Sequence, residues 1–196
     1  MKRREFVKKI GIGSAALTSL PTLAQAFFQL GDSEGDETRR ATGFRFVCVS
    51  QADRVGEILP RINMNGCATF NHSRAQGGGS YNEIDQNSPV PRTLFSAGRW
   101  DAGRVLSVNI IGTCGVLAAG TLEMEVRLLQ QIPHRAVIPA RLRVVCGIGA
   151  CGFDPGEEEG FVLTIPGHRF GPYRPFEVAP GFTFGITIFT TGEQDD

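Results

Sequence analysis

The sequence predicts an all-β fold: an antiparallel β-sandwich of about seven to eight strands, of which a jelly roll is one possible form. Two patterns carry this prediction. Apolar and polar residues alternate with a period of two in six runs, as in strands that bury one face. Turn-forming residues, mainly Gly, Pro, Asn and Asp, separate the runs. With 196 residues, 41% of them hydrophobic and 20% charged, the chain can form one such domain, which we expect at 43–192.

The predicted strands begin with the run at 44–48, and a further strand is expected within 61–71. A short helical turn is expected at 52–59, ended by Pro60. The other alternating runs lie at 106–110, 122–128, 142–146, 161–165 and 182–188. The run at 122–128 has residue types that favour helix, but its alternation is unbroken, so we expect a strand. The breaks between strands are expected at 77–79, 88–91, 154–156, 166–167 and 180–181.

The first 26 residues have the order of a cleavable export signal. Five of the chain's 20 basic residues stand here, a moderately apolar stretch follows at 10–20, and Ala24 and Ala26 supply the small side chains that a signal peptidase accepts. A stretch of this length is too short to span a bilayer. We therefore expect residues 1–26 to be removed, and the chain to have no permanent membrane span.

The block at 3–8 resembles the twin-arginine (Tat) export signal through Arg3, Arg4, Phe6 and Lys8. The resemblance covers the signal alone. It implies export by the Tat translocase, which moves cargo already folded, and a location in the periplasm, at the cell surface or outside the cell. A general secretory signal and a basic amphipathic helix are the alternatives for this segment.

Two short segments flank the expected domain. Residues 27–42 form a leader whose part at 31–40 is polar and contains glycine, so we expect a flexible tether, and residues 193–196 form an acidic tail. After the signal, 15 basic residues, all arginine, stand against 19 acidic residues. This balance disfavours a nucleic-acid partner, because phosphate binding needs local positive charge. The absence of lysine there excludes lysine chemistry.

The chain has an odd number of cysteines, so at least one must stay free or pair between chains: Cys48, Cys67, Cys114, Cys146 and Cys151. Cys48 and Cys146 fall on the apolar faces of their runs, where a thiol packs as a small hydrophobic group. Cys146 and Cys151 flank a Gly-rich turn. They are candidates for a disulfide or, with His168, for a metal or redox site, although the spacing differs from that of zinc ribbons.

Acidic residues at 154–159 are weaker candidates. Asp154, Glu157 and Glu159 offer oxygen ligands to Ca²⁺, but they lack the spacing of a calcium-binding loop, and a solvated hairpin tip is the alternative. The three histidines, His72, His134 and His168, are isolated from one another. We expect the single tryptophan, Trp100, to pack in the core. No cofactor is favoured.

Three classes of function remain open. The absence of a catalytic motif favours an exported, non-enzymatic module with a binding, accessory or structural role, whose partner is an unidentified protein or a second copy of the chain. One alternative is a metal-binding or redox protein that uses Cys146, Cys151 and a histidine. The other is a hydrolase acting on sugars or lipids with a site that sequence motifs do not reveal.

Overall fold

The computed structural model describes residues 42–179 and 182–191. The predicted signal at 1–26, residues 27–41 of the leader predicted at 27–42, and the tail at 193–196 lie outside the described residues, whereas Thr42 begins the first strand. Within the described residues the fold is all-β, as predicted, with a sheet of eight antiparallel strands and a small sheet of two. The strands are β1 (Thr42–Gln51), β2 (Pro60–Phe70), β3 (Ala75–Asp85), β4 (Leu94–Cys114), β5 (Leu117–Ile132), β6 (Ala136–Cys146), β7 (Gly160–Thr164), β8 (Glu177–Ala179), β9 (Phe182–Thr183) and β10 (Gly185–Thr191).

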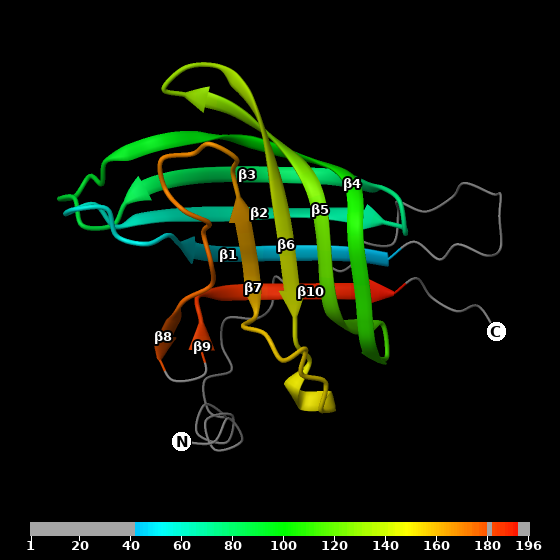
Figure 1. The fold of residues 1–196 in the computed structure, drawn as a ribbon. Helices are drawn as coiled ribbons and strands as arrows, with labels where there is room; N and C mark the ends of the chain where they lie inside the picture. The colour runs from blue at the N-terminus through cyan, green and yellow to red at the C-terminus, as the bar shows by residue number, and fades with distance from the viewer. Residues whose placement is uncertain (1–41, 180–181, 192–196) are drawn as a thin grey trace, which may run out of the picture. The chain divides into compact units, whose positions relative to one another are not determined.

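The main sheet is a meander in which each strand from β1 to β7 pairs with the next, and β10 returns to the free side of β1 (Figure 1). A jelly roll needs Greek-key connections between strands that are not neighbours in sequence. That form is therefore wrong for this chain, because short connections hold successive strands side by side. The shortest is the two-residue turn of Gly115 and Val116 between β4 and β5.

The sheet folds over itself into two layers. β4 and β5 are long, with 21 and 16 residues, and their pairing contains several register shifts, which let strands bend from one layer into the other. As a result β5–β7 cross β1–β3 (Figure 1), and the first residues of β5 pair with β10. On the other side, Tyr173 bonds to Leu163 of β7 and Arg174 bonds to Gln51 of β1, so this segment links the two layers.

Aromatic side chains fill the space between the layers. Phe46 of β1 lies 5.6 Å from Phe161 of β7 and 5.8 Å from Trp100 of β4, measured between ring centroids. Trp100 is fully buried, as predicted, and its Nε1 donates to the carbonyl oxygen of Asn65. A Cβ at Gly66 would lie 2.5 Å from the indole ring, so this glycine makes room for the tryptophan.

The glycines at 77–79 were expected to form a break between strands, and this prediction is wrong. They lie inside β3, where Gly79 pairs with Gly66 of β2 and with Trp100 of β4. Glycine is needed here because the backbones of β2 and β3 approach closely. A Cβ at Gly79 would lie 1.8 Å from the carbonyl oxygen of Asn65.

The apolar face of the last strand was also assigned wrongly. The alternation at 182–188 suggested that Phe184, Ile186 and Ile188 face the core. Instead Phe184 is 53% exposed and Ile186 is 64% exposed, whereas Thr187 and Phe189 are buried. The register with β1 places Phe189 opposite Phe44, and a shift of one residue moves every side chain to the other face.

Three further details complete the fold. Residues 52–59 form a turn closed by Val55 and Ile58 rather than the expected helical turn. In β4, Val105 is buried and Ile110 is 36% exposed, because the register shifts near Val105 change which residues face inward. No helix among the described residues is long and apolar enough to cross a membrane.

Candidate functional site

The outward face of β10, β1, β2 and β3 carries an open groove of about 540 Å³, which we call the outer groove. Strand register arranges its side chains in rows. One row runs from Ile186 through Val47 and Asn65 to Ser80, and a neighbouring row begins at Ile188. On the other side, the Phe184 carbonyl accepts from the Val49 amide, which places Phe184 beside the row of Val49. The alternate residues of β1, Phe44, Phe46 and Cys48, are buried in the core. The outer groove is therefore the solvent side of the strands whose inner side forms the core.

Half of the outer groove is apolar and exposed. Val47 is 63% exposed and Ile186 is 64% exposed. Ile188 on β10 and Phe184, which directly precedes β10, extend the same surface. Single exposed apolar residues are ordinary, but a contiguous set on adjacent strands marks an interaction surface.

The other half of the outer groove carries amides and hydroxyls on β2 and β3. The Asn63 Nδ2 donates to Asn82 Oδ1 over 2.5 Å, and the Ser80 hydroxyl donates to Asn65 Oδ1 over 3.2 Å. These side chains can also donate to and accept from the backbone of a bound polypeptide. Arg45 supplies the positive charge among the residues that line the outer groove.

The backbone edge of β10 is already occupied. The Thr187 amide donates to Glu159 Oε1 over 3.2 Å, the Thr187 carbonyl accepts from Cys146 Sγ, and Phe189 pairs with Ala118 of β5. A ligand strand cannot extend the sheet at these positions without displacing native partners. The exposed face, rather than the edge, is thus the available binding surface of β10.

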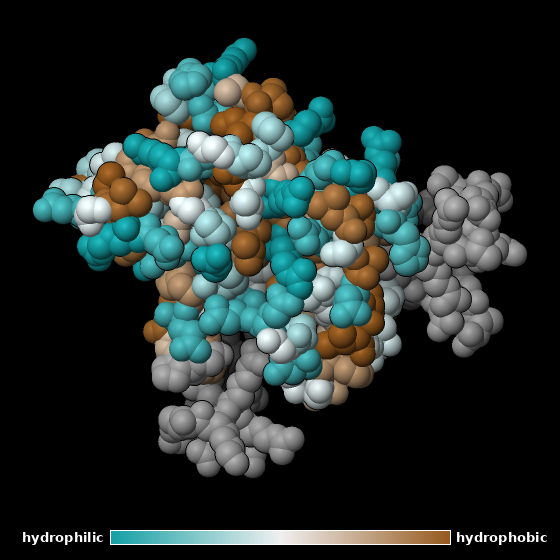
Figure 2. Space-filling view, in the orientation of Figure 1, coloured by the Kyte–Doolittle hydropathy of each residue, from teal (hydrophilic) through white to brown (hydrophobic). Residues whose placement is uncertain are grey.

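A second apolar surface lies at the end of the β4–β5 hairpin. Figure 2 shows hydrophobic surface there, and Ile110, Ile111, Val116 and Leu117 are between 36% and 52% exposed. Leu117 pairs with Thr190, two residues beyond Ile188. The hairpin surface therefore adjoins one end of the outer groove.

A buried carboxylate forms a separate polar cluster. Glu83 of β3 is 3% exposed, accepts a 2.7 Å hydrogen bond from the Tyr173 hydroxyl, and lies 3.7 Å from His168 Nε2. Burial, followed by the charge of Glu83, raises the pKa of Tyr173 far above its usual range. The cluster joins the 165–174 segment to β3. No hydrogen bond in the described residues joins a serine hydroxyl to a histidine.

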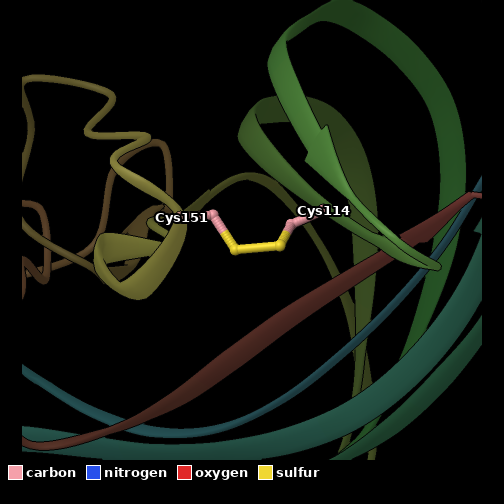
Figure 3. Close-up of a disulfide and its surroundings, with 2 residues drawn as sticks. All are labelled: Cys114 and Cys151. Atoms are coloured by element: carbon pink, nitrogen blue, oxygen red, sulfur yellow. A yellow bond between two sulfur atoms is a disulfide. The ribbon is translucent and has the colours of Figure 1, made fainter.

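The cysteines pair differently from the expectation. A disulfide joins Cys114 at the end of β4 to Cys151 in the 3₁₀ turn Gly149–Cys151 (Figure 3), so the suggested Cys146–Cys151 pair is wrong. Cys146 faces the core at the end of β6, and burial raises its pKa to about 11. Cys48 is also buried, as predicted, whereas Cys67 is free and exposed.

The structure does not bring the suggested metal ligands together. Cys151 is oxidised in its disulfide with Cys114, the Cys146 thiol donates a hydrogen bond to the Thr187 carbonyl, and His168 lies against Glu83. A thiolate ligand is unavailable from a cysteine in a disulfide. His72 and His134 are exposed in connections between strands.

The suggested calcium ligands also have separate partners. Asp154 Oδ1 accepts from the Gly156 amide, Glu157 forms a bidentate pair with Arg143, and Glu159 accepts from Thr187. Among the described residues, no group of three or more His, Cys, Asp or Glu side chains is placed to hold a metal ion.

Sequence reasoning missed the outer groove. The sequence of β1 contained a signal for it, because the four consecutive residues at 46–49 are all apolar. Side chains on both faces of the strand are therefore apolar, instead of those on one face only. A strand with one solvated face has polar residues at every second position. The run therefore indicated that both faces of β1 are built from apolar side chains.

Comparisons of the chain with protein-family models, with curated proteins and with solved structures found no match.

Proposed function

We propose that the protein is an exported, non-enzymatic binding module that holds another polypeptide in the outer groove. The exposed apolar set of Val47, Phe184, Ile186 and Ile188, on three adjoining rows of one sheet face, carries this proposal. Burial of such a surface is the main favourable term in protein association. A rigid sheet also presents these side chains in a fixed order, which limits the entropy lost on binding.

The chemistry of the outer groove favours an extended segment with two or three large apolar side chains. The apolar half of the groove accepts those side chains, and the amides of Asn63 and Asn82 lie where they can bond to a backbone. A segment with these features matches the outer groove in polarity.

Export is supported by two independent features. The N-terminal segment resembles a Tat signal, and the Cys114–Cys151 disulfide suits an oxidising compartment rather than a reducing cytoplasm. We accordingly place the module in the cell envelope or outside the cell. The Tat translocase and signal peptidase are its partners during export.

Selection from a random dodecapeptide library on phage tests the binding role. We expect selected peptides to contain large apolar residues, and Val47→Asp to abolish their binding because it places a charge among the apolar side chains. Val137→Asp is the matched control, since Val137 is 65% exposed on β6 in the other layer. Failure to select any peptide, or equal binding by both variants, would refute the proposed function.

A further inference from the structure

We propose that the outer groove is an interface between two copies of this chain, which pack face to face. The inference rests on the proposed function, because it takes the outer groove as a binding face and names its occupant. That face favours an extended segment with large apolar side chains, and the chain carries one in the wall of the groove itself. Phe184, Ile186 and Ile188 stand at alternate positions leading into and along β10, and all three are exposed.

The rows of the outer groove can match those of a second copy. A two-fold axis that crosses the strands along the row from Ile186 through Val47 to Ser80 places each strand over its own copy, so the two apolar halves cover one another. The amide half then meets the amide half. Asn and Ser side chains offer both donors and acceptors, so this half also complements itself.

The area of the face suits a stable pair. The strands β1, β2 and β3 have 10, 11 and 11 residues, and with β10 and the adjoining part of β4 they form a face of five strands. At strand and residue spacings of about 4.8 Å and 3.3 Å, the face measures about 800 Å². A standard interface buries about 800 Å² on each partner, and facing sheets commonly stack in this way. A single bound strand would cover only part of this area.

Pairing through the edge of β10 is a poorer alternative. The Thr187 amide already donates to Glu159, and Phe189 pairs with Ala118 of β5. A second copy that extended the sheet at these positions would displace native partners, whereas packing on the face displaces none of them. The pair is therefore expected to form between faces.

Cys67 provides a natural reporter of this interface. Its thiol is free and exposed, and it lies on β2 two residues from Asn65, which is about 7 Å from the proposed axis. The face extends about 16 Å along the strands on each side of that axis, so a second copy covers Cys67. The other free cysteines, Cys48 and Cys146, are already buried.

Sedimentation equilibrium and alkylation by iodoacetamide, both on the purified full chain, test the inference. The exposed anchors are aliphatic apart from Phe184, so we expect a Kd of about 10 μM, at the weak end for this area. Nine-tenths of the chains are then paired at about 0.5 mM, and Cys67 should react about tenfold more slowly there than at about 1 μM. A peptide selected on the outer groove should split the pair.

Val47→Asp and Ile186→Asp should keep the mass of one chain and the fast reaction of Cys67 at the higher concentration. Val137→Asp is the matched control and should pair as the unmodified chain does. Circular dichroism confirms that each variant is folded.

A single-chain mass at about 0.5 mM would overturn the inference. So would a pair in which Cys67 reacts at its dilute rate, or a pair that survives Val47→Asp, because the contact would then lie on another face. In each case, peptide selection that still depends on Val47 would leave the proposed function standing. The absence of both pairing and selected peptides would refute the two together.

Discussion

Removal of the disulfide between Cys114 and Cys151 should lower the stability of the domain substantially. The bond closes a loop with a sequence separation of 37 between β4 and the turn after β6. The loss of loop-closure entropy in the unfolded chain corresponds to about 4 kcal/mol at 25 °C for a loop of this length. We therefore expect Cys114→Ser/Cys151→Ser to lower the free energy of unfolding by about 4 kcal/mol, which is about 10 °C in Tm.

Urea unfolding of the oxidised chain and the double variant, followed by circular dichroism, measures this difference. Reduction of the unmodified chain should reproduce most of the loss. Cys67→Ser is the matched control, because Cys67 is exposed and unpaired and its replacement should change stability by less than about 0.5 kcal/mol. Equal stability of the oxidised chain and the double variant would refute the reasoning, as would an equally large effect of Cys67→Ser.

Two further predictions concern buried groups. Tyr173→Phe removes the donor to the buried Glu83 carboxylate and should cost about 1–3 kcal/mol in urea unfolding; an unchanged midpoint would contradict this. Burial raises the pKa of Cys146 from 9.0 to about 11. The stability that the buried, protonated thiol contributes is therefore complete below pH 9 and is lost as the pH rises to 11. The loss amounts to about 3 kcal/mol. Cys146→Ala should flatten the fall in stability across that window, and parallel profiles would contradict the assignment.

The strands of the core were predictable because their alternation is unambiguous. Residues 122–128 show this best: Leu122, Met124, Val126 and Leu128 are all buried in β5, as predicted, although the residue types favour helix. Pairing with β4 on one side and β6 on the other outweighs intrinsic propensity, which is worth only a fraction of a kcal/mol per residue. The two-residue period of the alternation therefore identified 122–128 as a strand, whereas residue composition alone would have predicted a helix.

Features fixed by long-range contacts were not predictable from local patterns. Phe184, Ile186 and Ile188 alternate regularly, yet the adjacent Phe189 takes the core position because β1 places Phe44 opposite it. The partner of Cys151 depends on where the end of β4 lies in space, which the spacing of cysteines does not encode. The outer groove arises from the first of these effects, since register decides which apolar set faces solvent.

The composition of β1 gives an argument for the outer groove that does not depend on pocket geometry. Strands covered on both faces carry near-continuous apolar runs, whereas strands with one solvated face alternate. Residues 46–49 are apolar without interruption, but packing against the core covers only Phe46 and Cys48 and leaves Val47 exposed. The neighbouring β10 has Phe189 inside and Ile186 outside. Each of these two adjacent strands thus carries an apolar side chain on its exposed face, which supports the proposal that a bound polypeptide covers the outer groove.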